Sequence, residues 1–134
     1  MANYSFNATG LAFSLDEQRL YVADTAFSHD PSAPRIIRVY DVVDGKSLTN
    51  GRVFTHIDPG FADGFRFDHN GYLYTSSLDS IQVYTEAGER LGKIYVPEKI
   101  GNCTFGGPNK NRLFIVATTS LYVIDLNTRG LHHP

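Results

Sequence analysis

Asp63 is the residue of this 134-residue sequence with the clearest capacity for chemistry. Its carboxylate can ligate a hard divalent cation, and it can also accept a proton from an attacking water. A metal-assisted hydrolysis needs a ligand for the metal ion and a general base close to the attacking water. Because Asp63 precedes a glycine, and Asp-Gly is a common turn sequence, a purely structural role is the alternative interpretation.

Four other residues have side chains that suit the surroundings of such a site. The Thr9 hydroxyl is a neutral oxygen ligand, although it can equally bond to its own backbone. Asp24 and Asn102 offer further oxygen atoms, and a structural role is the alternative for Asp24. The soft thiol of Cys103 does not suit calcium, so a buried structural role competes with a place in the site.

The elements that must position these residues follow an internal repeat. Each of three units contains a first apolar run, a polar turn and a second apolar run that begins at a leucine, namely Leu20, Leu73 and Leu113. These leucines are 53 and 40 residues apart, and an insertion at Ala26–Arg35 explains most of the difference. The insertion is either a substrate lid or an ordinary solvated loop.

Four short antiparallel strands in a repeat of about 40–50 residues are typical of a β-propeller blade. The sequence therefore predicts an all-β fold, a partial β-propeller of about three four-stranded blades in a single unit at 1–134. The predicted blades span residues 7–57, 61–96 and 102–126, and the last lacks its fourth strand. A β-sandwich, which also has short strands and regular turns, is the alternative.

In a propeller the first strand of each blade lines the central channel, and its first residues surround one mouth. Thr9, Asp63 and Cys103 hold these positions in the three units. We therefore predict that the three residues lie at one mouth, with Asp24 and Asn102 beside them.

An arc of three blades leaves exposed sheet edges, whereas complete propellers have about four to eight blades. We therefore expect the chain to be a fragment or one half of an assembly. A homodimer of two such halves would close a six-bladed ring. The segment Asn3–Phe6 is expected to supply the missing fourth strand of the third unit, in cis or in trans.

Composition excludes several classes of function. The formal net charge is −2 and no basic block exists, so nucleic acid is not an expected partner. The apolar runs are too short to span a membrane. A single cysteine excludes a disulfide framework and a cysteine-based zinc site. The first residues lack the pattern of a signal peptide, which favours a cytoplasmic location.

Four motifs occur in an order that resembles a known family: residues 9–16 with 20–25, residues 37–42 with 48–54, residues 62–71 and residues 102–108. Over about residues 6–130 the sequence resembles the C-terminal half of the family of gluconolactonase, regucalcin (senescence marker protein) and luciferin-regenerating enzyme. The resemblance implies a six-bladed propeller, and many members are calcium- or zinc-dependent hydrolases of lactones. The family's N-terminal half has no counterpart here.

The resemblance also implies roles for particular residues. Asp63 matches an aspartate that resembles both a metal ligand and a proton acceptor, so Asp63 is the predicted catalytic residue. Thr9 stands where the family usually places an asparagine ligand, so Asp63 and Thr9 are the predicted metal ligands, with a weakened site. The implied cofactor is a divalent metal, calcium first, with zinc or magnesium as alternatives.

Two functions remain open at this point. The chain is either a fragment or half-assembly of a metal-dependent lactone hydrolase that acts on a small lactone or ester, or a non-catalytic propeller fragment or binding module. The position of Thr9 and the missing blades favour the second interpretation, and the motif around Asp63 favours the first.

Overall fold

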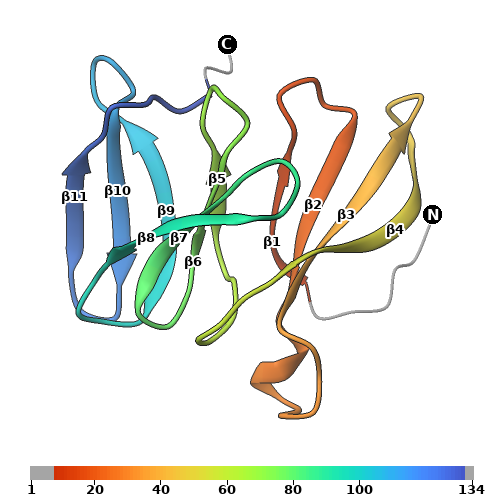
Figure 1. Cartoon of the computed structure of the whole chain (residues 1–134), viewed down its shortest axis with the longest axis horizontal. Helices are drawn as coiled ribbons and strands as arrows, with labels where there is room; N and C mark the ends of the chain where they lie inside the picture. Colours follow the sequence, from red (N-terminus) through yellow and green to blue (C-terminus); the bar gives the residue numbers. More distant parts are fainter. Residues whose placement is uncertain (1–7, 132–134) are drawn as a thin grey trace.

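The computed structural model describes residues 8–131, which form three antiparallel sheets arranged side by side (Figure 1). The first sheet contains β1 (Ala8–Phe13), β2 (Arg19–Asp24), β3 (Ile36–Val43) and β4 (Ser47–His56). The second contains β5 (Phe65–Phe67), β6 (Leu73–Ser76), β7 (Ser80–Tyr84) and β8 (Arg90–Tyr95). The third contains β9 (Ile100–Gly106), β10 (Arg112–Ala117) and β11 (Leu121–Asp125). Each sheet is an up-and-down meander in chain order, so the predicted all-β, partial-propeller fold is confirmed.

Helical structure within residues 8–131 is confined to the 3-10 turn η1 (Ala26–Ser28), which lies in the insertion of the first unit. The described residues therefore include no helix of the length and apolar character that a membrane crossing requires. The segment Asn3–Phe6, expected to complete the third sheet, lies outside the described residues.

The turns between the first and second strands of the sheets share one backbone feature. Each contains a residue with a left-handed conformation: Glu17 (φ 58°), Gly71 (φ 86°) and Lys110 (φ 57°). In the second sheet the fully buried carboxylate of Asp68 accepts hydrogen bonds from two N–H groups of its own turn. It also accepts a hydrogen bond from the Thr128 hydroxyl at 2.9 Å, which ties the segment after β11 to the second sheet.

The same aromatic contact joins each pair of neighbouring sheets. Tyr21 of β2 packs edge-on against Phe67 of β5, with ring centroids 4.8 Å apart. Tyr74 of β6 packs edge-on against Phe105 of β9, with ring centroids 5.2 Å apart. A separate apolar core surrounds each contact, one between the first and second sheets and one between the second and third. The sequence repeat is therefore also a repeat of the contact between sheets.

The first strands of the three sheets approach one another closely, because β5 contacts both β1 and β9. A Cβ atom on Gly10 would lie 2.0 Å from the carbonyl oxygen of Asp63. A Cβ atom on Gly64 would lie 2.0 Å from Oδ1 of Asn102. Both distances are far below van der Waals contact, so these two positions require glycine.

Gly10→Ala is expected to destabilise the fold by about 1–3 kcal/mol, because the added methyl group must push β1 away from the Asp63 carbonyl. Urea unfolding followed by circular dichroism measures the change. Gly92→Ala is the matched control, since its Cβ would meet no atom within 4 Å. Equal unfolding midpoints for the two variants would contradict the packing argument.

Candidate functional site

Three of the predicted site residues lie at the same end of adjoining strands. Thr9 belongs to β1, Asp63 directly precedes Gly64 and β5, and Asn102 belongs to β9. The contact of Gly10 with the Asp63 carbonyl and of Gly64 with the Asn102 side chain places them side by side. Thr9 and Asn102 are exposed and Asp63 is half-buried, so their oxygen atoms form an accessible group.

A buried serine of β6 holds the backbone at Asp63 through hydrogen bonds. The Oγ atom of Ser76 accepts hydrogen bonds from the N–H groups of Asp63 at 2.8 Å and Gly64 at 3.2 Å. The Gly64 N–H also donates to the Gly101 carbonyl at 3.1 Å, which links β5 to β9. Ser76 is fully buried, so these bonds are shielded from water and hold the Asp63 position rigidly.

The loop before Asp63 is anchored by a second buried polar residue. Nε2 of Gln82, which is fully buried in β7, donates to the Asp58 carbonyl at 2.9 Å. The Tyr84 hydroxyl donates to Oε1 of Gln82 at 2.6 Å, which fixes the orientation of the amide. Sequence reasoning missed Ser76 and Gln82, because nothing in a serine or glutamine within a strand indicates which loop it supports.

Three influences set the electrostatics of Asp63. Burial raises the pKa of the Asp63 carboxyl above its ordinary value, and this influence is the largest. The positive charge of Lys99 and a hydrogen bond with the Thr9 side chain oppose the rise in pKa. A half-buried carboxylate with a raised pKa is a better proton acceptor than an exposed one, so the position suits a general base.

The oxygen atoms gathered here suit a hard cation in kind, but they supply only part of a coordination shell. Asp63 offers a carboxylate, Thr9 a hydroxyl and Asn102 an amide oxygen that already accepts the Cys103 N–H at 2.8 Å. No group of three or more His, Cys, Asp or Glu residues lies together within residues 8–131. Calcium takes six to eight oxygen ligands, so water or other protein groups would have to provide the rest.

Asp24 and Cys103 do not line the mouth as predicted. The Asp24 carboxylate is buried, accepts the Ala26 N–H at 3.1 Å and lies 3.5 Å from Nε of Arg38. It therefore fastens the start of the insertion to the first sheet. The Cys103 side chain points into the core between the second and third sheets, with Sγ 3.6 Å from the Tyr74 carbonyl oxygen. Both residues have the structural roles that were the alternatives.

A row of aromatic and cationic side chains lies beside Asp63, and sequence reasoning did not find it. Nζ of Lys99 lies 5.0 Å from the ring centroid of Phe61, which is tilted against Phe27 at 6.4 Å between centroids. The guanidinium carbon of Arg35 lies 4.9 Å from the centroid of the Phe27 ring. The insertion therefore contributes to the surroundings of Asp63 through Phe27 and Arg35.

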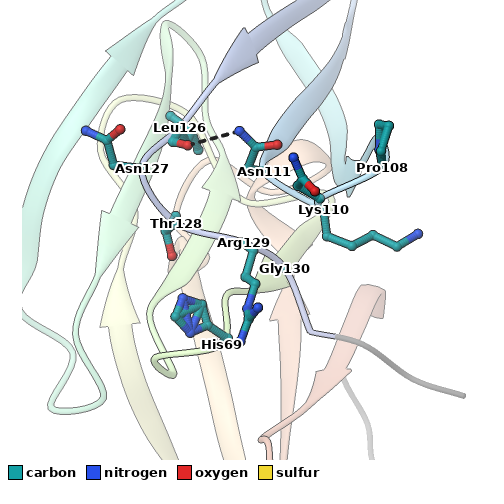
Figure 2. Close-up of a pocket in the computed structure, with 10 residues that line it drawn as sticks. His69, Pro108, Lys110, Asn111, Leu126, Asn127, Thr128, Arg129 and Gly130 are labelled. Carbon is teal, nitrogen blue, oxygen red and sulfur yellow. Dashed lines mark hydrogen bonds between the residues drawn. The ribbon is translucent and has the colours of Figure 1, made fainter.

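A broad hollow lies at the other end of the sheets (Figure 2). It has a volume of about 950 Å³ and is lined by His69, by the turn at 108–111 and by residues 126–130. His69 follows the end of β5, whereas Asp63 precedes its beginning, so the hollow is separate from the candidate site. Its size therefore says nothing about chemistry at Asp63.

Fold and site together define an arc of β-propeller blades with oxygen-bearing side chains at one end of its first strands. The sequence pattern of the SMP-30/Gluconolactonase/LRE-like region matches residues 3–119 of this chain. The chain belongs to this family, and the predicted resemblance is confirmed.

Individual relatives agree with this assignment. A gluconolactonase of Zymomonas mobilis is 32% identical over 132 residues, and the match covers 90% of this chain and 35% of that protein. The lactonohydrolase oryH of Aspergillus oryzae is 29% identical, with coverage of 90% of this chain and 30% of that protein. The chain thus spans about a third of the length of these curated relatives.

Solved structures show the same correspondence in three dimensions. A gluconolactonase of Xanthomonas campestris superposes with a TM-score of 0.82 at 36% identity, over 94% of this chain and 40% of that one. A calcium-binding regucalcin of Agrobacterium tumefaciens superposes with a TM-score of 0.80 over 95% of this chain and 48% of that one. Its identity is 17%, so this second likeness shows the fold alone.

The burial of Cys103 leads to a direct chemical prediction. Burial raises the pKa of the Cys103 thiol to about 12, so its thiolate fraction near neutral pH is about a thousandfold below that of a free cysteine. A colorimetric thiol reagent is expected to leave the folded chain unmodified and to react rapidly in denaturant. Rapid reaction under native conditions would contradict the placement of this side chain in the core.

Proposed function

We propose that this chain carries part of the active site of a lactone hydrolase that uses a divalent metal ion. The observation that supports the proposal is the half-buried Asp63 carboxylate, grouped with the oxygen atoms of Thr9 and Asn102 where three first strands meet. Membership of the family and relatives that hydrolyse lactones give the reaction class. The substrate is a small lactone.

In the proposed reaction Asp63 is the general base that accepts a proton from the attacking water. Water attacks the lactone carbonyl carbon, and Asp63 accepts the proton that the water loses. The acyl carbon–oxygen bond of the ring breaks, and the proton passes to the departing ring oxygen, so the product is a hydroxy acid. The hydrogen bonds from the Asp63 and Gly64 N–H groups to Ser76 hold the backbone that carries this carboxylate.

The metal in this proposal is held by Asp63 and Thr9, with Asn102 beside them. These are all oxygen donors, which suits calcium or magnesium better than zinc, because zinc prefers nitrogen and sulfur ligands. When bound, such an ion supplies Lewis-acid polarisation of the carbonyl oxygen. The hydroxyl of Thr9 is a weaker ligand than a carboxylate, so the affinity is expected to be modest.

Calcium is expected to raise the melting temperature of the chain, because an ion that binds only the folded state stabilises it, by about 2.7 kcal/mol at a hundredfold excess over Kd. Asp63→Asn is expected to abolish this rise. Differential scanning fluorimetry with a calcium titration measures it. The control is Asp44→Asn, which removes the same charge in the β3–β4 turn at the opposite end of the first sheet.

The outcome separates the two functions that the sequence left open. A calcium response that persists in Asp63→Asn would remove Asp63 from the metal site. A chain that shows no response to calcium and no lactone hydrolysis would instead be a non-catalytic propeller piece.

The proposal also requires the rest of a ring, and we propose that a second copy of the chain supplies it through the outer faces of the two end sheets. Phe114 pairs with Val123 on the outer face of the third sheet and holds the position that Tyr21 and Tyr74 hold in the other two, one residue after the repeated leucine. Phe13 pairs with Leu20, as Phe67 pairs with Leu73, and it is 42% exposed. A second copy of the chain would bring Phe114 against Phe13 at two identical junctions and complete six sheets.

Sedimentation equilibrium is expected to give twice the chain mass of 14.9 kDa. Phe114→Asp is expected to return the mass to that of the monomer, since it places a charge where each junction buries a ring. Tyr95→Asp is the control, because Tyr95 is 74% exposed on β8 of the middle sheet. A monomeric wild-type chain would show that a second copy does not complete the ring.

A further inference from the structure

The row of side chains beside Asp63 contains two cations whose surroundings differ. Arg35 is paired with a carboxylate, since its Nη1 atom lies 3.5 Å from Oδ1 of Asp58. Lys99 takes part in none of the ion pairs found among residues 8–131. The positive charge of Lys99 acts on the Asp63 carboxylate from beyond ion-pair distance.

Glu98, the acidic residue that precedes Lys99 in the chain, is hydrogen-bonded to other residues. The Glu98 carboxylate accepts hydrogen bonds from the Thr119 side chain and backbone and, at 2.8 Å, from the Tyr122 hydroxyl. These contacts draw Glu98 toward the β10–β11 hairpin. The charge of Lys99 is therefore left without a partner acid next to it in the chain.

The position of Lys99 is fixed at both its ends. Its carbonyl oxygen accepts a hydrogen bond from the Thr118 hydroxyl at 3.3 Å, which ties the loop before β9 to the β10–β11 hairpin. Its ammonium group lies over the Phe61 ring, two residues before Asp63. A cation–π contact of this kind holds the ammonium without neutralising its charge, so the charge remains available to an anion.

We propose that Lys99 is an anion-binding residue of this site, where it holds the carboxylate that lactone ring opening produces. The inference rests on the proposed function, because that reaction begins with a neutral ester and ends with a hydroxy acid, whose carboxyl group releases its remaining proton to solvent near neutral pH and leaves a carboxylate. Negative charge that develops beside the Asp63 carboxylate is stabilised by a nearby cation, and Lys99 supplies one in addition to the metal ion of the proposed function. An interaction that grows as charge develops favours the transition state over the neutral substrate.

Phe61 is the positioning residue in this arrangement. Its ring contacts the ammonium of Lys99 and also lies against Phe27 of the insertion. Gln82 anchors the start of the loop that carries this ring, through its hydrogen bond to the Asp58 carbonyl. The insertion thereby acts on the site indirectly, through the ring that carries Lys99.

The test measures binding of D-gluconate, a ring-opened hydroxy acid, in calcium-free buffer by isothermal titration calorimetry. Lys99→Met is expected to weaken gluconate binding about tenfold or more, because it removes the charge and keeps the apolar stem. Lys99→Arg is expected to retain most of the affinity, and Phe61→Leu is expected to fall between the two. Lys46→Met, in the β3–β4 turn, is the control and is expected to leave the affinity unchanged.

Glucitol, the neutral polyol of the same chain length, tests whether charge is what is recognised. Wild-type chain is expected to bind glucitol much more weakly than gluconate, with no difference between wild type and Lys99→Met. Equal affinity of the two ligands, no measurable gluconate binding, or undiminished gluconate binding by Lys99→Met would each overturn the proposal.

Hydrolysis assays with gluconolactone then separate this inference from the proposed function. Lys99→Met is expected to lower kcat with little change in KM, because the substrate is neutral. Gluconate binding that depends on Lys99 in a chain without hydrolytic activity would sustain the anion site and overturn the lactonase. Hydrolysis with an unchanged kcat in Lys99→Met would sustain the lactonase and overturn the role of Lys99.

Discussion

The close approach of the first strands is the constraint on which the rest of this structure depends. Gly10 lies against the Asp63 carbonyl, and Gly64 lies against the Asn102 side chain. A side chain at either glycine would separate the strands, and the aromatic contacts between the sheets would lose their spacing with them. The same approach gathers oxygen atoms from three sheets into one place, so the packing of the fold and the composition of the site have a single cause.

Buried polar groups of the middle sheet hold the backbone at the point where the first strands meet. Ser76 and Gln82 are fully buried, and each is used to hold the backbone just before β5. Burying such groups is unfavourable unless they are hydrogen-bonded, and here the partners are backbone groups of the loop that carries Phe61 and Asp63. Rigidity at the site is therefore built into the interior of the second sheet, while the outer faces of the end sheets remain apolar and open.

Sequence patterns predicted the sheets well because each blade of a propeller repeats the same order of apolar strands and polar turns. The leucines at Leu20, Leu73 and Leu113 lie in the second strand of successive sheets. The repeat gave Thr9, Asp63 and Cys103 equivalent positions, and the side chains that lie together are those of Thr9, Asp63 and Asn102. Cys103 was misplaced because one step along a strand turns a side chain to the opposite face of the sheet. No pattern could predict the contact of Lys99 with Phe61, since it joins two loops from different units.

Asp63 and Lys99 divide the charge changes of the proposed reaction between them. A half-buried carboxylate with a raised pKa is suited to accept a proton, and in doing so it becomes neutral. Asp63 gives this proton up again to the departing ring oxygen, so its carboxylate is charged once more when the acid product forms. The product carboxylate then adds a second negative charge beside Asp63, and the Lys99 ammonium offsets part of it. A cation held on an aromatic ring, and not on a competing acid, therefore suits the place next to Asp63.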